Sequence, residues 1–117
     1  MVGKTTTAFE NMTDEELSAE VGAKLGLPCI DTTIRLNMVD IVRSNYKSYA
    51  TSLDACREAI EKFMECHREY ECVELYYAAG HWCAEVLVLH DGRCELTAEH
   101  KNPARAACVC MLKALEK

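Results

Sequence analysis

The sequence lacks several features that would indicate a function directly. Its five glycines are scattered, so it has no glycine-rich loop that could hold a nucleotide phosphate. It has no apolar run near the ~20 residues of a membrane-spanning helix, because Glu and Lys interrupt every apolar stretch. Its Lys and Arg residues do not cluster, and the net charge is −6. Nucleotide binding through such a loop, membrane insertion as a helix and direct nucleic-acid binding are therefore disfavoured.

What is present is sufficient for one folded domain. The chain has 117 residues, the usual size of a single domain, and half of them are hydrophobic. The polar, Thr-rich start predicts a flexible tail over residues 1–12, followed by a single domain over residues 13–117. Residues 1–11 contain no apolar segment of the kind found in secretory signals. We therefore expect a cytoplasmic protein.

Cysteine is the abundant exception. Several of the eight cysteines fall on predicted apolar faces, where unpaired cysteine packs as a small hydrophobic residue. With a cytoplasmic location expected, the sequence predicts free thiols rather than disulfides. The eight are Cys29, Cys56, Cys66, Cys72, Cys83, Cys94, Cys108 and Cys110.

Two helices are marked by their capping residues. Thr13 and Glu16 have the spacing of a capping box, which predicts a helix over residues 14–25. Asn102 is a suitable cap for a last helix, and Pro103 suits its first position. Small apolar residues occur all around this last helix, so we expect it to be covered on more than one side.

A further helix is predicted from about residue 53 to residue 68. Its apolar residues recur at steps of three and four. Its acidic residues recur in the same way and form what we call the acidic ridge, which consists of Asp54, Glu58, Glu61, Glu65 and Glu69. Such a ridge is either an ordinary solvated helix face or a docking surface for a basic patch on another protein.

Three strands are predicted after this helix, over residues 70–78, 82–89 and 94–98. Ala79-Gly80 and Asp91-Gly92 are the turns between them. The fold class is therefore α+β, with helices packed on a three-stranded antiparallel meander as a layered sandwich. The order is helix, uncertain segment, helix, three strands and helix. The alternation in the second strand suggests that both faces of the sheet are at least partly covered.

The uncertain segment spans residues 29–47. Its apolar residues match neither the helical nor the strand period cleanly. A short helix near residues 37–43 and an extended excursion both stay open.

Two segments, with Trp82 between them, carry a resemblance to a known family. They are YATSLDACREAIEK at residues 49–62 and PARAACVCMLKAL at residues 103–115. With the looser match of the first helix, the chain resembles the phage ABA-sandwich domain family. The resemblance implies layers of helix, sheet and helix and a phage origin, but no particular biochemical activity. Residues 29–47 do not match the family and could carry a specific role.

No arrangement of residues predicts an enzyme or a metal site. His81, Cys83, His90 and Cys94 only imitate the paired spacing of zinc ligands, and an extended strand places Cys83 roughly 20 Å from Cys94. Cys66 and His67 are adjacent, so on a helix they point about 100° apart and cannot work as a nucleophile and its base. We expect no catalytic residues, no metal and no cofactor.

The leading hypothesis from the sequence is a non-enzymatic phage accessory protein. It would bind a bacterial host protein in the host cytoplasm through the acidic ridge, and inhibition of a host defence system such as CRISPR immunity is one such role. The alternative is a small-ligand-binding module or a homo-oligomeric structural module, for example a homodimer. Neither hypothesis involves a membrane or direct contact with nucleic acid.

Overall fold

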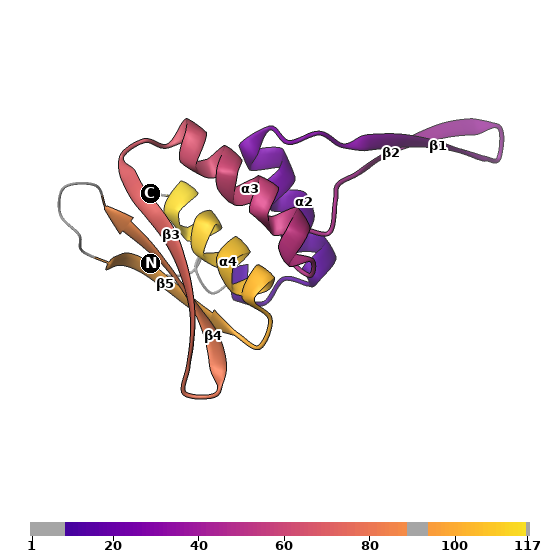
Figure 1. Ribbon diagram of the computed structural model, residues 1–117. Coiled ribbons are helices and arrows are strands. Elements are labelled where there is room, and N and C mark those ends of the chain that lie inside the picture. Colours follow the sequence, from indigo (N-terminus) through magenta and orange to yellow (C-terminus); the bar gives the residue numbers. More distant parts are fainter. Residues whose placement is uncertain (1–8, 89–93, 117) are drawn as a thin grey trace, which may run out of the picture.

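A computed structural model describes residues 9–88 and 94–116 of the chain. The described helices are α2 (Asp14–Leu25), α3 (Leu53–Cys66) and α4 (Pro103–Leu115). The described strands are β1 (Ile30–Leu36), β2 (Val39–Asn45), β3 (Tyr70–Ala78), β4 (His81–Val88) and β5 (Cys94–His100). They form two antiparallel sheets, β1-β2 and β3-β4-β5 (Figure 1). The predicted α+β class is confirmed.

Helix α4 is the centre of the domain. It packs against strands β4 and β5 on one side and against α2 and α3 on the other (Figure 1). For this reason small apolar residues all around it are buried, among them Ala106, Val109 and Cys110. The expectation that this helix is covered on more than one side is confirmed. Because α2 and α3 both contact α4, the three described helices lie on the same side of the three-stranded sheet, and a helix–sheet–helix sandwich is not confirmed.

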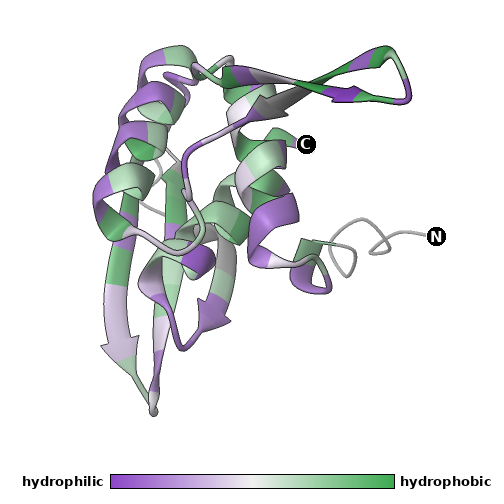
Figure 2. Cartoon of the chain, turned by 90° about the vertical axis from the view of Figure 1, so that its right-hand side faces the viewer, coloured by the Kyte–Doolittle hydropathy of each residue, from purple (hydrophilic) through white to green (hydrophobic). Residues whose placement is uncertain are grey.

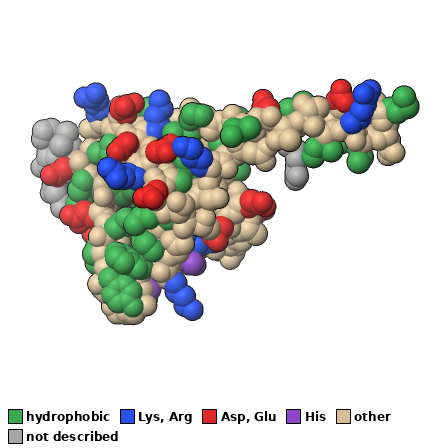
Figure 3. Space-filling model, turned by 45° about the vertical axis from the view of Figure 1, so that its right-hand side comes forward, with side chains coloured by type: hydrophobic (Ala, Val, Ile, Leu, Met, Phe, Trp, Pro, Cys, Tyr) green, Lys and Arg blue, Asp and Glu red, His purple; other side chains and the backbone are tan. Residues whose placement is uncertain are grey.

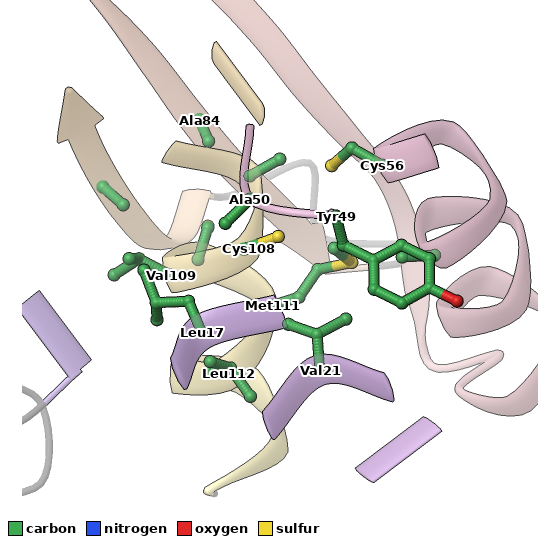
Figure 4. Packing of buried hydrophobic residues seen from close by; sticks show 14 of the residues in the cluster. Leu17, Val21, Tyr49, Ala50, Cys56, Ala84, Cys108, Val109, Met111 and Leu112 are labelled. Atoms are coloured by element: carbon green, nitrogen blue, oxygen red, sulfur yellow. The ribbon is translucent and has the colours of Figure 1, made fainter. Parts of the chain in front are cut away.

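The hydrophobic core lies around α4. Leu17 and Val21 of α2 and Met111 and Leu112 of α4 are fully buried side by side (Figure 4). Phe9 also belongs to this core, with only 4% of its surface exposed. Phe9 and the partly buried Met12 lie at the inner end of the predicted tail, and both pack against the core because burial of their apolar side chains is favourable. Residues 1–8 lie outside the described part.

The helix ends follow their capping residues. Thr13 accepts a hydrogen bond from the backbone N–H of Glu16 at 3.1 Å, and the Glu16 carboxylate accepts one from the Thr13 N–H at 2.8 Å. Gly26 ends α2 in the left-handed conformation, with φ of 68°. Helix α3 ends at Cys66, two residues earlier than predicted. The backbone of His67 is no longer helical, and its ring stacks on that of Phe63 with the ring centroids 5.2 Å apart.

The three-stranded sheet has the predicted meander. Strand β3 has the predicted bounds, and its turn into β4 is made by Ala79 and Gly80, both with positive φ. Ala84 and Val86 of β4 face the helices and are fully buried. Strand β5 runs to His100, two residues beyond the prediction. The predicted turn at Asp91-Gly92 lies outside the described residues. Among the described helices, none has both the length and the apolar character that a membrane span requires.

Candidate functional site

The uncertain segment of the sequence is a β-hairpin that projects from the domain. We call residues 30–45 the arm. Strands β1 and β2 pair along their whole length, and their register places Leu36 opposite Val39 and Ile30 opposite Asn45. The two-residue turn is formed by Asn37 and Met38, with φ of 51° and 66°. Figure 1 shows the arm extending away from the helices and from the three-stranded sheet.

The arm has one apolar face and one polar face. Side chains alternate along a strand, so residues that are paired across the two strands share a face. One face carries five aliphatic residues, Ile30, Ile34, Leu36, Val39 and Ile41, with Thr32, Arg43 and Asn45 on its half nearer the base. The opposite face carries Thr33, Val42 and the cross-strand ion pair between Arg35 Nε and Asp40 Oδ1 at 3.6 Å. Figure 2 shows this alternation of hydrophobic and hydrophilic residues along the arm.

The apolar residues of the arm are exposed. Seven of them, including Met38 at the tip, expose between 41% and 86% of their surface. Figure 3 shows hydrophobic side chains along the projecting arm and at its tip. An isolated two-stranded hairpin is at best marginally stable in water, and soluble domains seldom expose contiguous apolar surface without an interaction that uses it. The arm is therefore the principal candidate for a binding surface.

The base of the arm is fixed to the domain by two contacts, one with α2 and one with α3. The ring of Tyr46 packs on α2 where Gly22 has no side chain, and a Cβ on Gly22 would overlap that ring. Partial burial raises the pKa of Tyr46, and the neighbouring Cys29 thiol adds to this rise. The Lys47 ammonium donates hydrogen bonds to both carboxylate oxygens of Glu58 on α3, at 2.9 and 2.7 Å, which raises the pKa of Lys47. These contacts hold the base at α2 and α3 while the strands stand clear.

The buried segment after the arm contains Tyr49. Its side chain is fully buried against the core, and burial raises the pKa of its hydroxyl. Within the described part of the chain, this hydroxyl has no hydrogen-bond partner. A hydroxyl without a partner in such a position costs stability.

The acidic ridge is exposed along its whole length, but its charges are partly paired within the chain. Glu58 forms an ion pair with Lys47, and Glu61 Oε2 lies 3.8 Å from Arg57 Nε on the same helix. Glu69 lies beyond the end of α3, and its carboxylate is 3.9 Å from His67 Nδ1. Asp54 and Glu65 complete the exposed set. The ridge therefore presents less net negative charge than its five carboxylates suggest, and its role as a docking surface stays a prediction.

The residues considered for nucleophilic catalysis do not form a site. Cys66 is exposed at the end of α3, whereas the half-buried ring of His67 stacks on Phe63. The seven cysteines whose side chains the structure describes are free thiols. Cys56 and Cys108 meet in the core, where the Cys56 thiol donates to the Ala104 carbonyl at 3.6 Å. The contact with Cys56, together with burial, raises the pKa of Cys108, so this thiol is inert.

The grouping considered for a metal is not assembled either. Cys94 pairs with Leu87, whereas Cys83 pairs with Glu99 further along the sheet, so the two cysteines lie well apart. His90 lies outside the described residues. The structure instead brings His81 and Cys83 together with Glu99, a residue that the sequence analysis did not consider.

An open cleft of about 500 Å³ lies at the base of the arm, between α2 and the segment that follows β2. Its lining is largely polar and includes Asp14, Ser18, Tyr46 and Lys47. The Ser18 hydroxyl accepts a hydrogen bond from the Ala50 N–H, and Lys47 is bonded to Glu58, so both polar groups already serve the fold. The cleft therefore offers weaker support for a small-ligand site than the arm offers for a macromolecular one.

Of the two conformations left open for residues 29–47, the structure shows the extended one and not the short helix. The sequence analysis did not identify the hairpin, although a signal was present. Residues 30–36 alternate between Ile, Thr or Leu on one side and Asp, Thr or Arg on the other, which is the strand period. The turn hid the pattern, because Asn37 is followed by Met38 rather than by the glycine that normally marks a two-residue hairpin. Val42 on the polar face obscured the period further.

None of the family models, curated proteins or solved structures compared with the chain matches it. The resemblance to the phage ABA-sandwich family therefore stays a prediction.

Proposed function

We propose that this protein is a binding module that engages another polypeptide through the apolar face of its arm. The observation that carries the proposal is the exposure of five aliphatic side chains on one face of a hairpin that stands clear of the core. The resemblance to phage domains suggests the setting, a phage accessory protein whose partner is a bacterial host protein. Inhibition of a host defence system is the role that this setting favours, and no enzymatic step is part of the proposal.

The arm fits this role better than the acidic ridge does. Ion pairs within the chain already engage Glu58 and Glu61. Exposed ion pairs contribute little free energy, so pairing of the ridge with a basic partner would add little to affinity. The apolar face of the arm, in contrast, loses contact with water when a partner covers it. The arm also offers the edges of two strands for backbone hydrogen bonding, a recurrent way of binding extended peptides.

The size of the effect follows from the exposure of the arm. Ile34 and Ile41 lie opposite each other on the apolar face and expose 41% and 45% of their surface. Full burial of such a side chain is worth about 1.5–3 kcal/mol, so covering the exposed part is worth roughly 1 kcal/mol for each. Replacing both with serine should weaken binding by about 1.5–2.5 kcal/mol, which is roughly tenfold to a hundredfold in Kd.

The experiment compares two double variants on the same two strands. Ile34→Ser with Ile41→Ser changes the apolar face, and Arg35→Ser with Asp40→Ser changes the polar face as a matched control. Each protein is used to capture partners from bacterial lysate, and the Kd of the retained partner is then measured. Loss of the partner from the apolar-face variant alone supports the proposal. Equal retention by both variants contradicts it.

A homodimer is the second candidate function, and the self-complementarity of β1 favours it. If two copies of β1 pair antiparallel about Thr33, Asp31 faces Arg35 of the second copy and Ile30 faces Leu36 of the second copy. This register also fits the backbone. The pair that flanks the two-residue turn, Leu36 and Val39, is hydrogen-bonded, and hydrogen-bonded pairs alternate with non-hydrogen-bonded pairs along the ladder. The pair of Thr33 and Val42, three positions further on, is therefore not hydrogen-bonded. The N–H of Thr33 therefore points to the outer edge of β1.

Thr33→Pro tests the homodimer. It removes an N–H that the arm itself does not need, while a second copy would need it. Sedimentation equilibrium should show a dimer for the original chain and a monomer for this variant. A monomeric original chain, or a dimer that survives the substitution, would contradict pairing through β1.

A further inference from the structure

Three side chains with metal-binding atoms meet on the face of the three-stranded sheet that lies opposite α4. His81 and Cys83 are two residues apart on β4, so they point to the same side, and Cys83 is the direct cross-strand partner of Glu99 on β5. Ala84 and Val86 alternate with Cys83 and face the helices, which places the trio on the other face. One ligand atom from each of the three residues lies within 4.8 Å of the other two.

We propose that His81, Cys83 and Glu99 form a binding site for a zinc ion. The three donors are an imidazole nitrogen, a sulfur and a carboxylate oxygen, all of which zinc accepts. Ligand atoms on one tetrahedral zinc ion lie about 3.3–3.8 Å apart, given metal–ligand distances of about 2.0–2.3 Å. His81 Nε2 and Glu99 Oε1 are already 3.1 Å apart.

The site can close around an ion with little rearrangement. The backbone positions of all three residues are fixed by the β3-β4-β5 ladder, so only side-chain rotations are needed. Glu99 and His81 are the more exposed members, with 63% and 34% of their side chains accessible, so they are free to adjust. Cys83 is the fixed member, with 6% exposure. Three protein ligands leave a fourth position for water or for a group from a partner.

The type of metal follows from the donors. Calcium and magnesium prefer sites made of oxygen atoms, so a thiolate and an imidazole disfavour them. On binding zinc, the Cys83 thiol loses its proton to the buffer and the sulfur becomes an anionic ligand. The site would then carry one thiolate and one carboxylate, whose two charges balance those of Zn²⁺.

Two other interpretations account for less of the arrangement. A Cys–His–Glu catalytic group would need an accessible nucleophile, but Cys83 is almost fully buried. A plain ion pair accounts for His81 and Glu99, and the contact of Cys83 with its cross-strand partner Tyr76 accounts for the sulfur only separately. A metal ion uses all three donors and needs only one open position.

The zinc site is tested with the full chain in a reducing buffer free of metal. Cobalt(II) serves as the spectroscopic probe, because a cobalt–thiolate bond gives charge-transfer absorption, and zinc affinity is measured by competition with a chelator. One equivalent of cobalt should produce the thiolate band. Cys83→Ser should abolish the band and lower the zinc affinity at least about tenfold. Glu99→Gln, at an exposed position that does not threaten folding, should also lower the affinity.

Cys66→Ser is the matched control, because Cys66 is an exposed thiol at the end of α3, outside the trio. It should leave the cobalt spectrum and the zinc affinity unchanged. The absence of saturable binding would overturn the proposal. So would binding that is insensitive to both Cys83→Ser and Glu99→Gln, or binding that Cys66→Ser removes.

Discussion

Removal of the arm should leave the domain folded. Replacing residues 30–45 with Gly-Ser-Gly-Ser deletes both strands of the hairpin. The register pairs Ile30 with Asn45, so the two ends of the deletion lie about 5.5 Å apart. Four residues can span up to ~13 Å, and the linker therefore closes the gap without strain.

The expected change in stability is small because the arm adds nothing to the core. None of the described side chains of residues 30–45 belongs to the buried cluster around α4. Shortening the loop from sixteen residues to four halves its length twice. The entropic cost of closing the loop falls accordingly, which favours folding by about 1.2 kcal/mol. Some of that gain is offset because Cys29 and Tyr46 lose packing at the base. We therefore expect the free energy of unfolding to change by no more than about 1–2 kcal/mol.

The assay is urea unfolding followed by far-ultraviolet circular dichroism, with Leu17→Ala as the reference. Leu17 is fully buried, so its truncation should cost about 2–5 kcal/mol. A loss of more than about 3 kcal/mol in the free energy of unfolding on removing the arm would show that the arm supports the fold, contrary to this prediction. A stable protein without the arm would leave function as the reason for these sixteen residues.

Three further predictions concern the domain itself. Tyr49→Phe removes a buried hydroxyl without a partner in the described part of the chain, and urea unfolding should show a gain of about 1 kcal/mol; a loss would mean that the hydroxyl is satisfied. Gly22→Ala displaces the Tyr46 ring, and the overpacking cost of about 1–3 kcal/mol should exceed the gain in helix propensity of about 1 kcal/mol. The same unfolding assay should therefore show a less stable protein, and a more stable variant would contradict the contact between Gly22 and Tyr46. Partial burial lowers the pKa of His100, and its Nδ1 accepts a hydrogen bond from the Asn102 N–H. The unfolded chain therefore binds more protons than the folded one, so the free energy of unfolding should fall as the pH drops below about 6.5. His100→Gln should flatten that part of the stability–pH curve, and an unchanged curve would exclude this histidine as its source.

Most of the fold was predictable because local signals and tertiary packing agree. The capping residues Thr13 and Asn102 mark the starts of two helices, and the glycines at positions 26 and 80 mark a helix end and a turn. The apolar surround of α4 indicated burial on more than one side, and the structure confirms it. Where signals of this kind exist, a single sequence is informative.

The turn of the arm and the grouping of His81, Cys83 and Glu99 were not predictable, for physical reasons. The arm turns through Asn37 and Met38 in left-handed conformations, and a methionine in that conformation has no sequence signature. The trio depends on register. Glu99 reaches Cys83 only because β4 and β5 pair in one particular alignment. That alignment includes a register shift between Val86 and Leu87, which counting along the sequence does not reveal.

The central claim is that the apolar face of the arm binds another polypeptide. The most direct measurement is the Kd of the captured partner for three proteins: the original chain, the apolar-face variant Ile34→Ser/Ile41→Ser and the polar-face variant Arg35→Ser/Asp40→Ser. Binding through the apolar face predicts that the apolar-face variant binds roughly tenfold to a hundredfold more weakly, while the polar-face variant stays within about threefold of the original chain. Equal affinities for all three proteins, or a larger loss in the polar-face variant, would contradict it.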